Sequence, residues 1–326
     1  RKMSGPSCRS SAAEAAAKVT SIFIYPIKSC RGISVSQAAI TSTVPTSIVC
    51  EYTGFRWDRQ WLIVNSNGRG YTQRVQPKLA LIQVELPNEA FSEGWLPTKS
   101  SFLVIRAPGM TELKIPLSRP CEISDGVSVW EWSGSALDEG PEASNWFSSY
   151  LGKPSRLVRF NEGKENRPVD PNYAHGYNVM FSDMYPFLLL SQGSLNALNK
   201  LLKEPVSVNR FRPNIFVDGC EPFSEDLWKE MKINKLTFRG VKLCSRCKVP
   251  NINQETAIAS AEPTQTLKKF RTDKVLHLAK NPQGLVYFGQ NLVCIESSTE
   301  GKGKIIKVGD PVYVLEAIPS PAEAAV

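Results

Sequence analysis

Short apolar runs rich in β-branched and aromatic residues dominate the first half of the chain, and such runs predict strands. The first run ends where Pro26 and Lys28 appear, and a later run closes at the turn sequence N-S-N-G at 65–68. We therefore predict strands at residues 19–27, 61–64, 79–86, 102–107 and 126–132.

Few segments carry the apolar period of a helix. Residues 141–151 begin at Pro141 and are followed by Gly152, which is the usual order of helix start and stop signals. Residues 191–202 begin at Ser191, a capping residue, and repeat Leu at helical spacing, and residues 262–270 form a third candidate. Strands are expected to resume at 156–160, 214–217, 236–243, 285–288 and 304–314. The pattern predicts a mostly β, α+β fold with few helices and without alternating β-α units.

The predicted elements divide the chain near residue 152, where a helix ends and a strand follows after Pro154. We expect a flexible tail or targeting remnant at 1–18, a β-rich domain at 19–152 and a second domain at 153–326. The first 18 residues are rich in Ser, Ala and basic residues, with Glu14 as their only acid, which resembles a transit peptide weakly, and a disordered tail is the favoured interpretation. No apolar run approaches the roughly 20 residues that cross a bilayer, so we expect no transmembrane segment.

The composition of the chain favours anionic ligands and acidic partners. The 326 residues are 42% hydrophobic, which is enough for a sizeable core, and the formal net charge is +8. A basic surplus of this size favours acidic partners or anionic ligands. No Lys/Arg run exceeds two residues and no aromatic-basic RNA-binding motif is present, so nucleic acid is not an expected partner. A monomer is the default expectation.

Cysteine and histidine usage narrows the possible chemistry. The eight cysteines are irregularly spaced in a long chain, unlike a disulfide scaffold, so we expect mostly reduced thiols. The two histidines, His175 and His277, are too few for a multi-histidine metal site and argue against a Ser-His or Cys-His catalytic arrangement.

The sharpest local motif is C-S-R-C at 244–247. Such a pair can form half a zinc site, a redox dithiol, one reactive thiolate, or two buried structural cysteines. A zinc site lacks a second pair or a nearby histidine, and Pro250 opposes the early helix that a thioredoxin-like dithiol expects. Arg246 and Lys248 flank Cys247 with positive charge, which favours a thiolate, and a thiolate is a soft metal ligand.

Three further segments place basic residues beside apolar strand ends. They are Y-P-I-K-S-C at 25–30, W-D-R-Q-W at 57–61 and N-R-F-R-P-N at 209–214. Taken singly, each is explained by a basic side chain that extends to solvent or pairs with a carboxylate. The functional alternative is a phosphate clamp, in which Arg offers a bidentate fork, Lys a point charge and Ser a hydroxyl.

Taken together, the ordered motifs resemble the MOSC family, and most closely the plant-type mitochondrial amidoxime-reducing components, with similarity to the C-terminal region of molybdenum cofactor sulfurases. The resemblance covers about residues 19–316. Its motifs are Y-P-I-K-S-C at 25–30, W-D-R-Q-W at 57–61, S-D-M-Y-P-F at 182–187, F-R-P-N at 211–214, D-G-C at 218–220, C-S-R-C at 244–247, F-G-Q-N at 288–291 and V-G-D-P-V at 308–312.

The resemblance implies a MOSC fold, with a β-barrel-like core and an N-terminal β-rich subdomain, and a bound molybdenum cofactor (molybdenum with molybdopterin). In such proteins the cysteine at the position of Cys247 is the catalytic metal ligand. The residues implied in holding the pterin and its phosphate are Lys28, Ser29, Arg59 and Arg212, with Asn214 and Arg246 beside them. Cys220 is expected near the site without being a ligand.

Two departures from the family pattern stand out. Relatives commonly carry two small hydroxyl residues after the Asp of the S-D motif, where this chain has Met184 and Tyr185. A contact to the cofactor there would come from backbone N–H groups or from the Tyr185 hydroxyl. Residues 43–52 resemble an insertion before the W-D-R-Q-W motif.

The implied function is reduction of N-hydroxylated compounds such as amidoximes and hydroxylamines, and of nitrite to nitric oxide. The implied electron donors are cytochrome b5 and NADH-cytochrome b5 reductase, and the implied location is the mitochondrion, with the cytoplasm as the alternative. Two other functions stay open. One is a sulfurase-related MOSC protein, whose pyridoxal phosphate binding belongs to a separate domain, and the other is a molybdenum-cofactor carrier without redox turnover.

Overall fold

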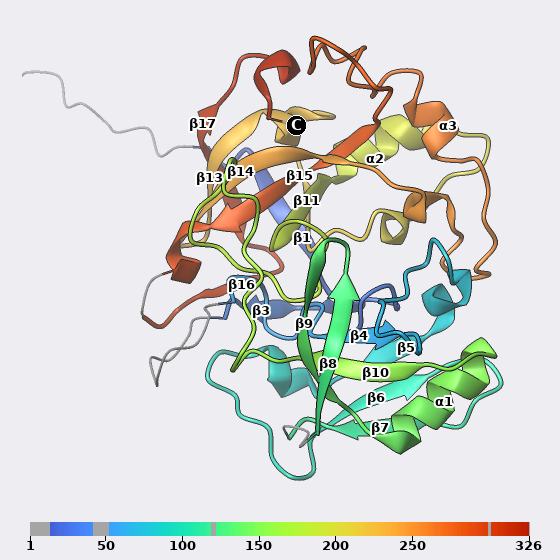
Figure 1. Cartoon of the computed structure of the whole chain (residues 1–326). Coiled ribbons are helices and arrows are strands. Elements are labelled where there is room, and N and C mark those ends of the chain that lie inside the picture. The colour runs from blue at the N-terminus through green and yellow to red at the C-terminus, as the bar shows by residue number, and fades with distance from the viewer. Residues whose placement is uncertain (1–13, 42–51, 119–121, 299–300, 326) are drawn as a thin grey trace, which may run out of the picture.

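The structure is a computed structural model that describes residues 14–41, 52–118, 122–298 and 301–325. It has two parts, a barrel above and a layer of smaller sheets below (Figure 1). Residues 1–13 of the expected tail and residues 43–51 of the suspected insertion lie outside the described residues.

Seven strands close into the barrel because β12 pairs with β11 on one side and with β1 on the other. The pairing of β11 with β12 is parallel and the other pairings in this barrel are antiparallel. The order around the barrel is β1 (Ala17–Ile24), β12 (Ile215–Asp218), β11 (Phe187–Ser191), β15 (Tyr287–Cys294), β14 (Leu236–Ser245), β13 (Trp228–Ile233) and β17 (Pro311–Ala317), with β2 (Ile33–Val35) added beside β1.

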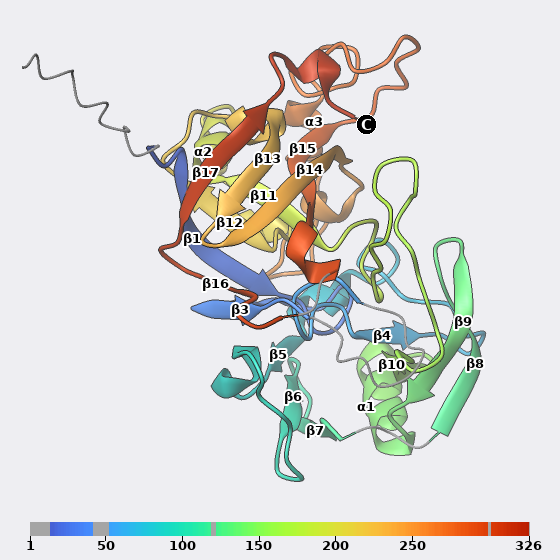
Figure 2. The same ribbon diagram turned by 90° about the vertical axis from the view of Figure 1, so that its left-hand side faces the viewer.

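The lower layer holds two further sheets, seen side-on in Figure 2. One has the order β4 (Trp61–Val64), β10 (Arg156–Phe160), β9 (Trp132–Asp138) and β8 (Glu122–Val129), and the other β5 (Gln83–Glu85), β6 (Phe102–Arg106) and β7 (Leu113–Pro116). A two-stranded ribbon of β3 (Gln37–Ala39) and β16 (Ile305–Lys307) lies between this layer and the barrel.

Helices are short and lie at the margins. Helix α1 (Pro141–Leu151) packs on β10, while α2 (Gln192–Asn199) and α3 (Thr264–Leu267) lie beside the barrel. Within the described residues, no helix combines the length and apolarity needed to cross a membrane. The 3-10 turns are η1 (Pro77–Leu81), η2 (Asn88–Phe91), η3 (Val208–Arg210), η4 (Ser224–Leu227), η5 (Val249–Asn251), η6 (Ile295–Ser298) and η7 (Pro321–Glu323).

One apolar core runs through both parts of the molecule. At its centre the ring of Phe187 meets the edge of Phe55 at a centroid distance of 4.8 Å and the ring of Phe238 at 5.4 Å. Phe55 precedes β4 of the lower layer, while Phe187 and Phe238 belong to barrel strands. The barrel therefore depends on the layer beneath it for part of its packing.

The mostly β, α+β prediction is confirmed, and α1 has the predicted bounds. Several element predictions were wrong in detail. The strand predicted at 79–86 begins as η1, which Pro77 starts, and only β5 is extended. The strand predicted at 126–132 contains the turn between β8 and β9, and the one at 304–314 divides into β16 and β17.

The two other predicted helices are shorter than expected. Helix α2 ends at Asn199. The Asn199 side chain donates to the Val206 carbonyl and accepts the Val206 N–H, so the chain turns away from the helix. Helix α3 starts only after Pro263. The division of the chain at residue 152 stays a prediction. Strand pairing crosses this point, since β1 belongs to the barrel and β10 to the lower layer.

Replacement of Phe187 by Ala should lower the free energy of unfolding by about 3–5 kcal/mol, because it opens a cavity between two aromatic neighbours in the core. Chemical denaturation monitored by circular dichroism measures this change. Leu315→Ala is the control, since that side chain is 54% exposed and its truncation should change stability by less than about 0.5 kcal/mol. Equal effects of the two substitutions would contradict the packing role of Phe187.

Candidate active site

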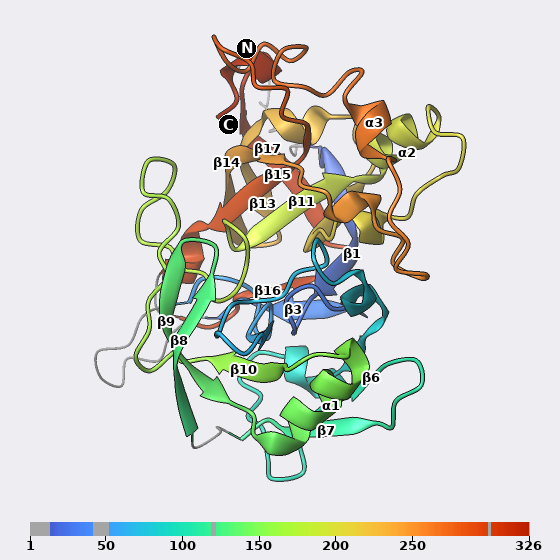
Figure 3. The ribbon, with the colours of Figure 1, turned by 45° about the vertical axis from the view of Figure 1, so that its right-hand side comes forward.

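A cavity of about 110 Å³ lies where the barrel meets the lower layer. Its walls come from distant parts of the chain: the loop after β1, the segments before β4, β11 and β12, the end of β14, and the β8–β9 turn. The hairpin of β8 and β9 rises from the lower layer toward the barrel (Figure 3).

The structure brings every residue of the predicted site to this one cavity. The residues that line it include Lys28, Ser29, Arg59, Met184, Tyr185, Arg212, Asn214, Arg246 and Cys247. Their roles toward a cofactor stay predictions. Cys220, expected near the site without being a ligand, is not among the lining residues.

Tyr25 is the platform on which two of the arginines lie. The guanidinium groups of Arg59 and Arg212 each stand 4.3 Å from the centre of its ring, at the distance of a cation–π contact. The Tyr25 hydroxyl donates to the Pro213 carbonyl at 3.1 Å, and burial raises the pKa of this phenol to about 12, so it stays a donor. Gly32 leaves room for the ring, because a Cβ at that position would approach it to 2.5 Å.

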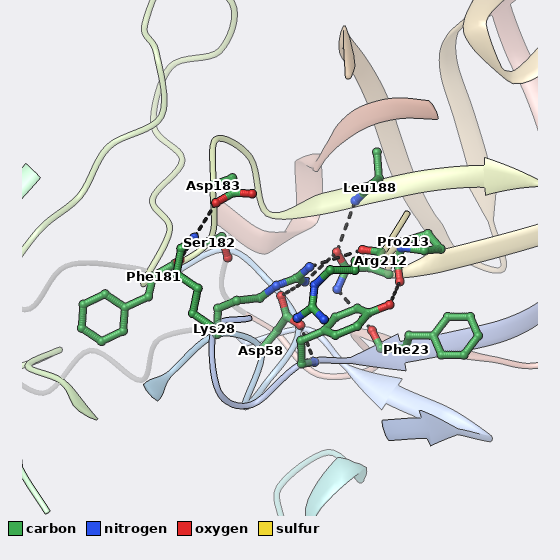
Figure 4. Close-up of polar contacts among 12 residues, drawn as sticks. Phe23, Lys28, Asp58, Phe181, Ser182, Asp183, Leu188, Arg212 and Pro213 are labelled. Atoms are coloured by element: carbon green, nitrogen blue, oxygen red, sulfur yellow. Dashed lines mark hydrogen bonds and ion pairs between the residues drawn. The ribbon is translucent and has the colours of Figure 1, made fainter. Parts of the chain in front are cut away.

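Arg59 is fixed by a second set of contacts, which are among the dashed lines in Figure 4. Its Nη1 donates to Asp58 Oδ2 at 2.5 Å and to Asn214 Oδ1 at 3.1 Å, and its Nη2 donates to the Arg212 carbonyl at 3.3 Å. Asp58 is fully buried and also accepts the backbone N–H of Tyr25. Because these partners come from two segments that are far apart in the sequence, Arg59 can hold one orientation.

Lys28 is a buried ammonium at the other side of the cavity. Its Nζ donates to the Phe181 carbonyl at 2.7 Å and forms an ion pair with Asp183 (Figure 4). Burial lowers the pKa of Lys28 from 10.5 to about 8, against the opposing effect of Asp183. Although desolvation by the surrounding protein favours the neutral acid, the Lys28 ammonium holds the pKa of Asp183 well below its usual range, so this carboxyl is ionised at neutral pH.

The C-S-R-C motif lies at the end of β14 with both cysteines on the cavity. Arg246 donates from Nη1 to Cys244 Sγ at 3.1 Å and from Nη2 to the Phe211 carbonyl at 2.7 Å. Cys244 and Cys247 are free thiols, and burial raises the pKa of the Cys244 thiol. Cys247 is half-buried, so a ligand in the cavity can reach it.

Backbone strain gathers at the same residues. Ser29, Arg59 and Arg212 have φ values of 69°, 50° and 56°, in the left-handed region that non-glycine residues rarely adopt. Each such residue costs about 1–3 kcal/mol and persists only where the surroundings enforce it, most often at functional sites. That three predicted site residues share this feature is independent support for a binding site here.

The cavity carries surplus positive charge. The basic residues that line it are Lys28, Arg59, Arg74, Arg212 and Arg246. Asp183 and Asp58 neutralise two of them, which leaves three of five charges without a carboxylate in this lining. Among the described residues, the buried donors Arg212 Nη2 and Arg246 Nε have no hydrogen-bond partner. A buried unpaired donor is costly, so this arrangement is preorganised for an anion.

The prediction did not include several residues that shape the site. Arg167 holds the loop before β11 through three backbone carbonyls, Met180 at 2.9 Å, Ser182 at 2.5 Å and Asp183 at 3.0 Å. Trp130 and Arg74 line the cavity as well. Only Asp183 carried a sequence signal, through its S-D motif. The remaining residues reach the cavity by tertiary packing, which a local pattern does not reveal.

The two departures from the family pattern also line the cavity. Met184 is 44% exposed and offers an apolar surface, while Tyr185 is buried. The Tyr185 hydroxyl has no hydrogen-bond partner within the described part of the chain. It is therefore available as a donor toward a ligand. Within the described part of the chain, no cluster of three or more His, Cys, Asp and Glu side chains could hold a metal ion by itself.

Comparison with known proteins agrees with this architecture. Residues 16–154 match the family described as the MOSC N-terminal beta barrel domain, and residues 176–313 match the MOSC domain. The chain belongs to the MOSC family. Among its relatives, the mitochondrial amidoxime reducing component 2 of Bos taurus is 33% identical over 90% of this chain and 82% of that protein. The mitochondrial amidoxime-reducing component 1 of Homo sapiens is 33% identical over 91% of this chain and 82% of that protein.

Anion binding in the cavity should weaken as Lys28 loses its proton. We expect the affinity for sulfate, whose charge is constant over this range, to fall by roughly tenfold between pH 7 and pH 9. Isothermal titration calorimetry measures it. Lys28→Arg should remove the pH dependence, because a guanidinium keeps its charge. The same pH dependence in both proteins would contradict the assignment.

Deprotonation of Lys28 should also change the free energy of unfolding, which rises with pH where the anion affinity falls. The pKa of Lys28 is about 8 in the folded chain and 10.5 in the unfolded chain, so the unfolded state binds more protons between these values. The contribution of Lys28 to the free energy of unfolding therefore rises as the pH rises from 8 to 10.5.

The Tyr25 ring should matter more than its hydroxyl. Tyr25→Leu removes the surface on which Arg59 and Arg212 lie, and we expect roughly a three- to tenfold loss of sulfate affinity. Tyr25→Phe keeps the ring and loses one hydrogen bond, so its loss should stay within about threefold. The same calorimetric titration compares them, with thermal melting as a check on folding. An equal loss in the two variants would rule out the platform role.

Proposed function

We propose that this chain is a molybdenum-cofactor-dependent oxidoreductase that reduces N-hydroxylated compounds. The observation that carries the proposal is the cavity itself. Within the described residues it combines three basic side chains that lack a carboxylate partner, unpartnered buried donors on Arg212 and Arg246, and a half-buried cysteine. The names of the relatives, amidoxime-reducing components, support the same class of reaction.

The residues present fit the cofactor. A pterin phosphate needs a basic, donor-rich cradle, and Lys28, Ser29, Arg59 and Arg212 are the groups that would hold it. The unpartnered Nη2 of Arg212 is a donor that such a phosphate would satisfy. The thiol of Cys247 is a soft ligand suited to the metal, while Cys244 is already engaged by Arg246. Asn214 and Arg246 would orient these groups through the contacts described above.

The reaction proposed is R–C(NH2)=N–OH + 2 H+ + 2 e− → R–C(NH2)=NH + H2O. The bound cofactor supplies the two-electron chemistry at the N–O bond. The chain's own residues bind and orient the substrate and shield the cavity from bulk water. The ionised carboxylate of Asp183, whose side chain is 67% exposed beside the cavity, can accept an N–H of the amidine group.

Electrons are proposed to arrive from cytochrome b5, which NADH-cytochrome b5 reductase would reduce. The formal charge of +8 supports docking of an acidic electron carrier through electrostatic complementarity. The mitochondrial names of the relatives support a mitochondrial location for this chain.

Replacement of Cys247 by Ser should leave the pterin bound and reduce the rate of benzamidoxime reduction by roughly 100-fold or more, because the metal would lose its thiolate. Activity is measured with cytochrome b5 and its reductase on protein from a host that makes the cofactor. Molybdenum is determined by plasma mass spectrometry and pterin by fluorescence after oxidation. Cys220→Ser is the matched control, since Cys220 is a free thiol that does not line the cavity.

The outcomes separate the candidate functions. Full activity in Cys247→Ser would remove this thiol from the mechanism. A folded wild-type protein without molybdenum and pterin would overturn the cofactor assignment. A wild-type protein that holds both and shows no turnover would point to a carrier. If Arg59→Ala and Arg212→Ala each contain neither molybdenum nor pterin, the proposed phosphate-binding role of these arginines is supported.

A further inference from the structure

Trp130 has a backbone conformation that is unfavourable for a bulky side chain. It is the first of two residues in the turn between β8 and β9, where Val129 pairs with Trp132. Its φ is 53°, and two-residue hairpin turns prefer Gly or Asn where φ is positive. A bulky aromatic residue at such a position is an outlier that the surrounding structure must hold in place, and outliers of this kind gather at functional sites.

The contacts that hold Trp130 all lie at the cavity. Its indole N–H donates to Asp183 Oδ1 at 3.2 Å. The guanidinium of Arg74 stands 4.1 Å from the ring centre and Lys28 Nζ stands 5.5 Å from it. These contacts fix the ring at the edge of the cavity, in line with the rise of the hairpin toward the barrel (Figure 3).

Trp130 nevertheless keeps an exposed surface. Trp130 is 38% exposed, whereas Trp57, Trp61, Trp146 and Trp228 are all buried. Met184, which is 44% exposed, lines the same cavity. Two exposed large apolar side chains therefore border the cavity that holds Cys247. This combination fits a ligand with a polar end inside and a flat apolar body outside.

A second cavity adjoins the first and gives such a body room. It encloses about 180 Å³ and shares Asp183, Met184 and Tyr185 with the first. Glu131, the other residue of the hairpin turn, lines it. The turn therefore borders both spaces, with Trp130 on one and Glu131 on the other.

We propose that Trp130 contacts the substrate and selects planar aromatic N-hydroxylated compounds, such as aryl amidoximes, over small aliphatic ones. The proposal rests on the function proposed above and adds the class of substrate. The aromatic body lies against the indole ring and Met184, and the N–OH end points into the cavity that holds Cys247. An aliphatic substrate with a methyl group in place of the ring gains little from this contact.

The test compares benzamidoxime with acetamidoxime on the holoenzyme. Trp130→Ala should raise the KM for benzamidoxime by about three- to tenfold and change the KM for acetamidoxime by less than about twofold, because only the aryl group loses a stacking partner. Trp130→Phe keeps a ring and should stay near the wild type for both. Ile123→Ala is the control, since Ile123 lies on β8, is 58% exposed and does not line the cavity.

A glycine variant separates function from folding. Trp130→Gly should have a Tm at or above that of Trp130→Ala, because glycine adopts a φ of 53° without strain. It should still lose the preference for benzamidoxime. Molybdenum and pterin contents should equal those of the wild type in every variant. A fall in either content in Trp130→Ala would place the ring against the cofactor and overturn the proposal, as would a parallel rise of both KM values.

A binding measurement that needs no turnover distinguishes the role of Trp130 from the proposed function. Calorimetric titration of the holoenzyme with benzamidine and acetamidine, the corresponding products, needs no electron donor. We expect benzamidine to bind more tightly than acetamidine to the wild type and the difference to vanish in Trp130→Ala. If the wild type shows this preference without reducing either amidoxime, the proposed function fails and the role of Trp130 stands. If the wild type shows no preference, the role of Trp130 is refuted whatever the activity.

Discussion

Arg59 and Arg212 both lie on the ring of Tyr25, and the rest of the cavity is arranged around this shared contact. Two guanidinium groups in a partly dehydrated space repel each other, and each loses hydration. The electron-rich face of Tyr25 offsets part of that cost, and Asp58 neutralises Arg59 alone. Arg212 is therefore left with an unpartnered donor and with a pKa that burial lowers. A bound anion would satisfy this donor.

The same arrangement explains why strained backbone and buried charge occur together. Asn214 joins Arg59, the Leu188 N–H and the Phe23 carbonyl, so that it ties β1 and β11 to the arginine (Figure 4). A site held from so many directions can keep Ser29, Arg59 and Arg212 at positive φ. The rigidity has a functional use, because donors that are already oriented need no reorganisation when a ligand arrives.

The features that could be predicted from the sequence are those that depend on neighbouring residues in the chain. Proline and glycine marked the ends of α1, and motifs in a fixed order carried the family and the residues that meet at the cavity. Contributions that depend on the tertiary fold were not visible. The turn at Trp130 was read as strand because its neighbours are apolar, and no pattern links it to Asp183, 53 residues away. The barrel pairing of β1 with β12 was equally hidden, since periodicity gives the faces of a strand and not its partners.

The closure of the barrel has a consequence for biosynthesis. Lys18 is paired with Asp218 in β12 and with Pro311 in β17, so β1 can join the barrel only after both of these later strands have been synthesised. Contacts of such long sequence separation form slowly, because a large loop must close before they contribute. Lys28 and Ser29 lie in the loop after this strand, and they meet Cys247 only once the barrel is closed. A cofactor that needs the whole cradle would thus bind only after the strands on both sides of β1 have been synthesised and paired with it.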